Sequence, residues 1–290
     1  MRNILKMLSL FICFLISDCF AESQIDGIDC IYLINLDRRP DRLAFSTAEL
    51  ARYNIQAQRF SAIDGKKLPY ETLLEIGLPY KLEMLSHRWA NTPAGNGKLQ
   101  RVYLDRSAEN KIVFFEGTTI GAVGCALSHL SVLKEAYAAG YETIWILEDD
   151  ICIKQDPHIL ADLIKSLDSL TDGQWDVLYT DMDEFGEKSQ PVNSFWWLWR
   201  PDLALFNSKI FTERNRISKD FIQIGSRGRM HSFIIRRSGM KKLLDYIENY
   251  HLYQPIDHEI AFASNMRLFM TAYPIVTYSN KFTTDIQIFP

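Results

Sequence analysis

Three consecutive carboxylates follow an apolar, β-prone run near the middle of the chain. Residues 143–147 (Thr-Ile-Trp-Ile-Leu) form the run, and Glu148, Asp149 and Asp150 come directly after it. Adjacent acids repel one another and cost solvation free energy when covered, so they need water, a cation or a cationic substrate beside them. Glu148 and Asp150 project to one side of an extended chain, which suits binding of Mn²⁺ or Mg²⁺ that carries a diphosphate. A solvated turn after a strand is the alternative interpretation.

Other polar side chains follow two further predicted strands. Asn35 lies near the end of the apolar run 29–36, and Arg38 and Arg42 flank a helix start at Pro40. Asp64 follows the alternating run 55–63, where it could accept hydrogen bonds from a ribose or a base. In open α/β sheets ligands bind at the carboxyl ends of strands, which is where these residues fall. A solvated helix start and an ordinary Asp-Gly turn explain them equally well.

Two helix starts add candidates of a different kind. Residues 119–139 are predicted to form a helix, on which Gly121, Gly124 and Ser128 make a stripe of small side chains. Such a stripe allows close approach of a packed sheet or of a ligand's phosphates. Asp257 lies in the first turn of a helix predicted after Pro255, where an acid suits the helix dipole but could also serve metal-assisted transfer.

Strands and helices alternate from Cys30 to Thr180, which is typical of an α/β sheet with parallel character. Further strands are predicted at residues 231–236, followed by a helix that Ser238 would cap, and at 273–276. Residues 66–116 show a poor pattern, and the segment 91–97 is expected to be loop. We therefore expect one domain over residues 22–290, with an insertion at about 181–230.

The N-terminus and the charge balance limit the class of protein. Residues 1–21 resemble a signal peptide, with Arg2 and Lys6 before an apolar centre and Cys19-Phe20-Ala21 at the cleavage site. A retained signal anchor is the alternative, and no other stretch approaches membrane-spanning length. The net charge of −4 excludes the broad basic field that nucleic-acid binding usually needs.

Residues 194–200 (Ser-Phe-Trp-Trp-Leu-Trp-Arg) carry three tryptophans without a clean period. Tryptophan rings stack on the apolar faces of sugars, so this segment is a candidate sugar platform. A core plug or a partner surface explains it equally well.

Several of these motifs together resemble glycosyltransferase family 25, which includes lipooligosaccharide galactosyltransferases and collagen hydroxylysine galactosyltransferases. The N-terminal motifs that carry the resemblance are residues 34–42, 62–65, 121–129 and 147–151. The C-terminal blocks are residues 233–239, 255–257 and 284–286. The resemblance implies a GT-A fold, a nucleotide-sugar donor such as a UDP-hexose (galactose or glucose), and inversion at the anomeric carbon. The acceptor would be a hydroxyl of a glycan, a lipooligosaccharide or a protein.

The resemblance also implies roles for individual residues. Glu148 and Asp150 would hold Mn²⁺ or Mg²⁺, and Asp257 would be a further ligand or the general base. The nucleotide-sugar pocket would be formed by Asn35, Arg38, Arg42, Asp64, Gly121, Ser128 and Asp149. The diphosphate that leaves needs its charge neutralised by a metal ion, and the acceptor hydroxyl needs a carboxylate base to take its proton. These residue types therefore suit the reaction.

Two other classes of protein remain as alternatives. An exported carbohydrate-binding protein on the same scaffold would use Trp196, Trp197 and Trp199 without catalysis. A metal-dependent phosphodiesterase needs similar acids, but the sequence offers no His-rich ligand set for one. Export leads to the periplasm, the exterior or the ER/Golgi lumen, and a lumen suits the chemistry because bacterial periplasm lacks nucleotide sugars.

Overall fold

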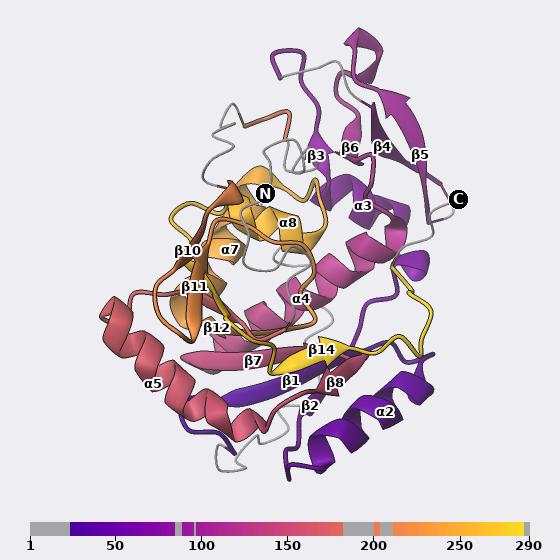
Figure 1. Ribbon diagram of the computed structural model, residues 1–290. Helices are drawn as coiled ribbons and strands as arrows, with labels where there is room; N and C mark the ends of the chain where they lie inside the picture. The colour runs from indigo at the N-terminus through magenta and orange to yellow at the C-terminus, as the bar shows by residue number, and fades with distance from the viewer. Residues whose placement is uncertain (1–23, 85–88, 96, 182–199, 204–210, 287–290) are drawn as a thin grey trace.

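The computed structural model describes residues 24–84, 89–95, 97–181, 200–203 and 211–286 (Figure 1). The predicted signal peptide (1–21) and the tryptophans of the 194–200 segment lie outside the described residues. Among the described residues, no helix is both long enough and apolar enough to cross a bilayer.

The centre of the fold is an eight-stranded mixed sheet. Its strand order is β10 (Arg214–Arg216), β11 (Phe221–Ile224), β13 (Leu268–Thr271), β9 (Val177–Tyr179), β12 (Ser232–Arg236), β7 (Thr143–Glu148), β1 (Cys30–Asn35) and β2 (Gln58–Ser61). β1 pairs in parallel with β2 and β7, and β9 pairs in parallel with β13. β12 runs antiparallel between β7 and β9. The prediction of a mixed α/β sheet flanked by helices is therefore confirmed.

Helices cover both faces of this sheet (Figure 1). α4 (Ile120–Ala139) and α7 (Arg237–Tyr250) pack on one face through residues such as Val123, Leu127 and Met240. α2 (Pro40–Ala51) and α5 (Leu160–Thr171) pack on the other through residues such as Leu50 and Leu163. The strands are buried on both faces, because alternate side chains of β1 and β7 enter the two cores. This explains their unbroken apolar runs.

A four-stranded antiparallel sheet lies at one end of the molecule (Figure 1), in the order β3 (Leu78–Pro79), β6 (Ile112–Phe115), β4 (Trp89–Ala94) and β5 (Lys98–Tyr103). The expectation that residues 91–97 are loop is wrong, since most of them belong to the β4–β5 hairpin. The segment was predicted to be loop because it is rich in asparagine, proline and glycine, which are common in turns. β4 pairs with β6 only at Ala90 and Asn91, so Pro93 lies beyond that pairing and its missing N–H costs no ladder bond there.

The remaining elements are short. They are α3 (Tyr70–Ile76), α8 (Ile256–Glu259), the paired strands β8 (Ile151–Ile153) and β14 (Val276–Tyr278), and the 3₁₀ turns η1 (Gly65–Lys67), η2 (Arg106–Ala108), η3 (Pro157–Ile159) and η5 (Ile260–Phe262). α7 begins at Arg237, so the expectation that Ser238 caps it is wrong. The Ser238 hydroxyl instead donates to Asp176, 2.7 Å away.

α4 begins and ends as predicted. The Thr119 hydroxyl caps its start by accepting from the backbone N–H of Ala122 at 3.1 Å. Gly140 ends it in the left-handed conformation at φ 85°.

Candidate metal and nucleotide site

The acidic triplet lies at the carboxyl end of β7, beside a histidine that directly precedes the neighbouring strand, β12. Nδ1 of His231 lies 3.1 Å from Oε2 of Glu148 and 3.1 Å from Oδ1 of Asp150. Ser232 of β12 pairs with Leu147, so His231 comes opposite Glu148 where the antiparallel pairing continues. Cross-strand neighbours have Cβ atoms about 5 Å apart, which explains this contact.

Glu148 is held from a second side by α4. Nε2 of His129 lies 3.2 Å from Oε1 of Glu148, and the Cys125 thiol lies 3.6 Å from the same oxygen. Burial alone would raise the pKa of Glu148, but hydrogen bonds to His129 and His231 lower it below its ordinary value. Burial, Glu148 and Asp257 together raise the pKa of the Cys125 thiol. Glu148 is therefore a carboxylate, and Cys125 is a neutral thiol.

Asp149 and Asp150 share one guanidinium. Nε of Arg42 lies 2.7 Å from Asp149, and its Nη2 contacts Asp150. The Asn35 amide donates to Asp149 at 2.7 Å. Burial raises the pKa of Asp149 to about 6, although Arg42 and Asn35 act to lower it. The structure thus brings Asn35 and Arg42 to the acids, in the places expected from the ends of β1 and the start of α2.

Arg42, which binds Asp149 and Asp150, belongs to a larger group of arginines that the C-terminal segment contacts. Arg38 and Arg42 donate to Asp285 at 2.6 Å and 3.2 Å, and Arg39 also contacts this carboxylate. Arg38 further pairs with Asp64 at 3.1 Å. One carboxylate from the end of the described chain, that of Asp285, therefore contacts three guanidiniums beside the acidic triplet.

The small-residue stripe of α4 packs against backbone on both sides. The Ser128 hydroxyl donates to the Gly124 carbonyl at 2.7 Å and accepts from the Ile63 N–H at 2.8 Å. A Cβ on Gly121 would meet the Asp285 carbonyl at 2.6 Å. The stripe thus locks the turn after β2 and the C-terminal segment onto α4.

These residues surround a small cavity of about 70 Å³. Its lining includes seven of the predicted site residues, namely Arg38, Arg42, Asp64, Gly121, Ser128, Glu148 and Asp149. Asp285 and Ile286 also line it, whereas the predicted site residues Asn35, Asp150 and Asp257 do not belong to its lining.

Asp257 does not belong to the ligand cluster that includes Glu148 and Asp150, but it lies in the same region of the molecule. Its carboxylate accepts from the backbone N–H of Arg229 at 2.7 Å, two residues before His231. Its charge acts on Cys125, which contacts Glu148. α8 therefore presents Asp257 to the same region from another side.

The donor set fits a divalent cation. One ligand atom from each of Glu148, Asp150 and His231 lies within 4.8 Å of the other two. Carboxylates with one imidazole match the ligands that Mn²⁺ accepts. His231 was not predicted as a site residue because it lies far along the chain from the triplet. Only a prediction that residues 231–236 lie antiparallel to β7 could have revealed it.

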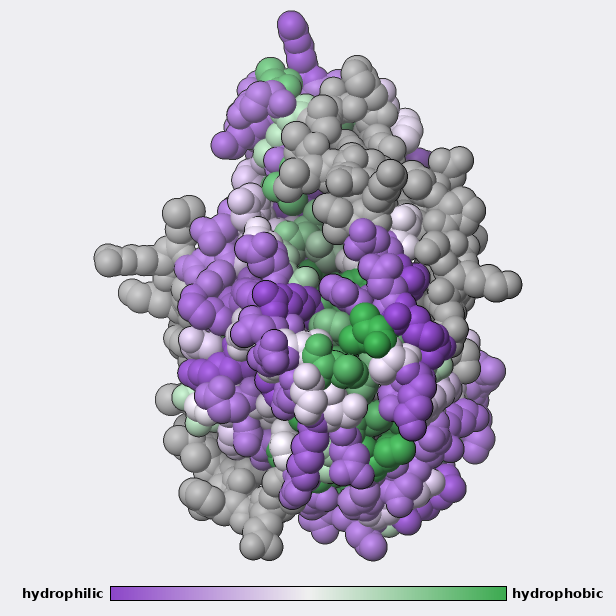
Figure 2. Space-filling view, turned by 60° about the vertical axis from the view of Figure 1, so that its left-hand side comes forward, coloured by the Kyte–Doolittle hydropathy of each residue, from purple (hydrophilic) through white to green (hydrophobic). Residues whose placement is uncertain are grey.

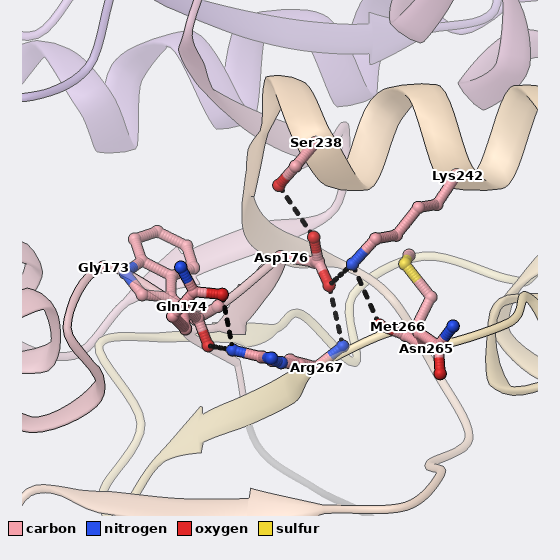
Figure 3. Close-up of a pocket in the computed structure, with 9 residues that line it drawn as sticks. Gly173, Gln174, Asp176, Ser238, Lys242, Asn265, Met266 and Arg267 are labelled. Carbon is pink, nitrogen blue, oxygen red and sulfur yellow. Dashed lines mark hydrogen bonds and ion pairs between the residues drawn. The ribbon is translucent and has the colours of Figure 1, made fainter.

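A larger cavity of about 470 Å³ lies at the opposite edge of the sheet, before β9 and β13 (Figure 3). The carboxylate of Asp176 is at its centre and is already bonded to Ser238, to Lys242 at 2.6 Å and to the Arg267 N–H at 2.8 Å. This cavity contains no metal-binding cluster among the described residues. The face of the molecule in Figure 2 is mainly hydrophilic, with hydrophobic residues grouped near its middle.

Comparison with known proteins assigns the chain to a family. The family model described as glycosyltransferase family 25 (LPS biosynthesis protein) matches residues 28–260. The chain therefore belongs to glycosyltransferase family 25, a class of transferase to which the resemblance of its motifs also pointed.

Three relatives illustrate the range of the family. A glycosyltransferase 25 family member of Drosophila melanogaster is 28% identical over 57% of this chain and 23% of its own length. Human procollagen galactosyltransferase 2 is 28% identical over 53% of this chain and 20% of its own. A mouse protein named inactive glycosyltransferase 25 family member 3 is 28% identical over 53% and 22%. The chain thus matches about a fifth of the length of these curated relatives.

Among solved structures, apo UDP-glucose pyrophosphorylase aligns with 50% of this chain and 51% of its own at 8% identity. The TM-score of 0.28 is too low to support a common fold.

Proposed function

We propose that this protein is a metal-dependent, inverting glycosyltransferase that moves a hexose from a UDP-sugar to a hydroxyl group. The observation that carries the proposal is the cluster of Glu148, Asp150 and His231 beside the arginines Arg38 and Arg42. Galactose is the first hexose to test because one relative is named a procollagen galactosyltransferase. Glucose is the second.

The residues divide the chemical work. Glu148 and Asp150 would hold Mn²⁺ or Mg²⁺, and the bound ion would supply Lewis-acid stabilisation of the leaving diphosphate. Arg38 and Arg42 would contact the phosphates, because guanidinium groups bind phosphate in a bidentate manner. Asp64 and Asn35 would position the nucleoside end.

Asp257 is proposed as the general base. Its carboxylate is separate from the candidate ligand cluster, and the Arg229 N–H fixes its position. A base must lie on the acceptor side of the sugar, within hydrogen-bond reach of the attacking hydroxyl. Inversion then follows from a single in-line attack.

The C-terminal segment must move for the donor to enter. The cavity of about 70 Å³ is small beside ligand pockets, which are usually about 300–1,000 Å³. Asp285 and Ile286 line this cavity, and Asp285 engages the arginines that would bind phosphate. We propose that the donor's diphosphate replaces the Asp285 carboxylate on these arginines.

The site of action is part of the proposal. We propose that residues 1–21 direct export and that the enzyme works where nucleotide sugars are present, as in the ER or Golgi lumen. The acceptor would be a glycan, a lipooligosaccharide or a protein.

The decisive experiment is a panel of UDP-sugars incubated with the mature chain and Mn²⁺, with UDP release as the readout. UDP-galactose and UDP-glucose should give metal-dependent release that EDTA abolishes. Tight binding of glycans without release from any nucleotide sugar would instead support the carbohydrate-binding alternative, in keeping with a relative that is named inactive.

A further inference from the structure

We propose that His231 is the third protein ligand of the divalent cation, completing a set of one imidazole and two carboxylates. This inference rests on the proposed metal-dependent function and adds a ligand from outside the acidic triplet. It also gives the site a preference for Mn²⁺ over Mg²⁺.

The distances match a shared coordination sphere. Nδ1 of His231 lies 3.1 Å from Oε2 of Glu148 and 3.1 Å from Oδ1 of Asp150. Neighbouring ligand atoms around an octahedral ion with bonds of about 2.1 Å are about 3 Å apart. An ion placed among these three atoms therefore needs little movement of the side chains.

The backbone of His231 is fixed from both directions. Its N–H donates to Oδ2 of Asp181 at 3.0 Å, and its carbonyl accepts from the Glu148 N–H at 2.9 Å. Asp181 is itself buried and pairs with Arg227 at 2.8 Å. The imidazole ring stacks on Tyr278, with the centroids 5.2 Å apart and the planes inclined by 27°. This rigidity is typical of a ligand whose position matters.

The three side chains also open on the same space. Glu148, Asp150 and His231 have relative exposures of 15%, 16% and 18%. An ion at this place would keep free coordination positions for the donor's phosphate oxygens. The two carboxylates are also held in position from their other side. His129 contacts the other oxygen of Glu148, and Arg42 contacts the other oxygen of Asp150.

An imidazole changes which metal is favoured. Mg²⁺ prefers oxygen ligands and retains water, whereas imidazole suits the first-row transition metals. A site of two carboxylates alone would discriminate weakly between Mg²⁺ and Mn²⁺. The set with His231 should therefore bind Mn²⁺ well above Mg²⁺.

The test is pulsed EPR of Mn²⁺ bound to the mature chain, with and without UDP. We expect ¹⁴N modulation from a coordinated imidazole in the wild type, and its loss in His231→Gln together with an increase of at least about tenfold in the Mn²⁺ dissociation constant. His158→Gln is the matched control, since His158 is exposed and pairs only with Asp156 among the described residues. It should leave both quantities unchanged.

The outcomes separate the inference from the proposed function. Mn²⁺ that binds in a Glu148-dependent way without ¹⁴N coupling would overturn the role of His231 and leave the metal-dependent function intact. Coupling that persists in His231→Gln would also overturn it and would point to His129. Absence of any Mn²⁺ binding, even with UDP, would overturn both. Clear coupling without UDP release from any UDP-sugar would support His231 and contradict the transferase activity.

Discussion

At the scale of single residues, the acidic triplet gives its three members different environments. Glu148 lies between two histidines, Asp149 is buried between Arg42 and Asn35, and Asp150 joins Arg42 to His231. Glu148 is the last residue of β7, and Asp149 and Asp150 form the turn that follows it. This turn brings Glu148 and Asp150 to the same imidazole, that of His231. The middle acid is therefore suited to holding Arg42 and the outer two to holding a cation.

Glu148→Gln and Asp150→Asn should each lower Mn²⁺-dependent UDP release by at least about 100-fold, because a metal-held charge contributes several kcal/mol to the transition state. Steady-state kinetics would measure the loss, and circular dichroism would check the fold. Asp245→Asn is the control, since Asp245 is half exposed on α7 and pairs with Lys241. Full activity in either test variant would remove the basis of the proposed function.

Asp257→Asn should lower kcat by about 10²–10⁴-fold while Mn²⁺ affinity stays within about twofold, because a general base acts on the proton and not on the ion. Kinetics together with Mn²⁺ titration would separate the two quantities. A parallel loss of metal affinity would make Asp257 a ligand.

At the scale of elements, close contacts with α4 hold the pocket walls together. A Cβ on Gly124 would lie 2.5 Å from the Gly65 nitrogen and 2.6 Å from the Ile63 carbonyl oxygen. Helix propensity alone favours alanine over glycine by about 1 kcal/mol. The clash is with backbone, however, and overpacking of this kind costs about 1–3 kcal/mol.

Gly124→Ala should therefore destabilise the protein by about 1–2 kcal/mol, as measured by urea denaturation. Gly95→Ala is the control, because no heavy atom beyond the two adjacent residues lies within 4 Å of the position that its Cβ would take. A stabilised Gly124→Ala variant would mean that α4 can move away from the turn after β2.

The C-terminal segment should control access of phosphate to the arginines, because Asp285 is bonded to them. Asp285→Asn removes the charge that competes with phosphate for Arg38 and Arg42, so UDP should bind several-fold more tightly in calorimetric titrations with Mn²⁺ present. Weaker binding would show that Asp285 supports the pocket and does not compete with the diphosphate.

At the scale of the whole molecule, ligand binding should be visible as stability. Mn²⁺ and UDP together at about 100 times their dissociation constants should add about 2.7 kcal/mol and raise Tm by several degrees. Differential scanning fluorimetry with UDP and Mn²⁺, or with UDP and EDTA, would measure the shift. Equal melting curves in the two conditions would contradict a metal-dependent nucleotide site.

Local patterns in the sequence were sufficient for much of the fold. The apolar runs predicted β1 and β7, helical spacing predicted α4, and charge after an apolar run predicted a site at the end of β7. These signals are local, because burial on both faces of a strand and capping at a helix end depend on neighbours along the chain. Asn35, Arg42 and Asp64 were predictable in the same way, because they lie at the end of β1, in the first turn of α2 and shortly after β2.

Tertiary structure alone decided which distant residues meet the triplet. β12 enters between β7 and β9, and this pairing places His231 opposite Glu148 across 83 residues of sequence. The return of the segment around Asp285 to the start of α2 likewise places this carboxylate on three arginines. Strand order and chain return depend on packing summed over the whole core. A local pattern could therefore predict acids at the end of a strand. It could not predict that His231 and the C-terminal segment with Asp285 lie beside them.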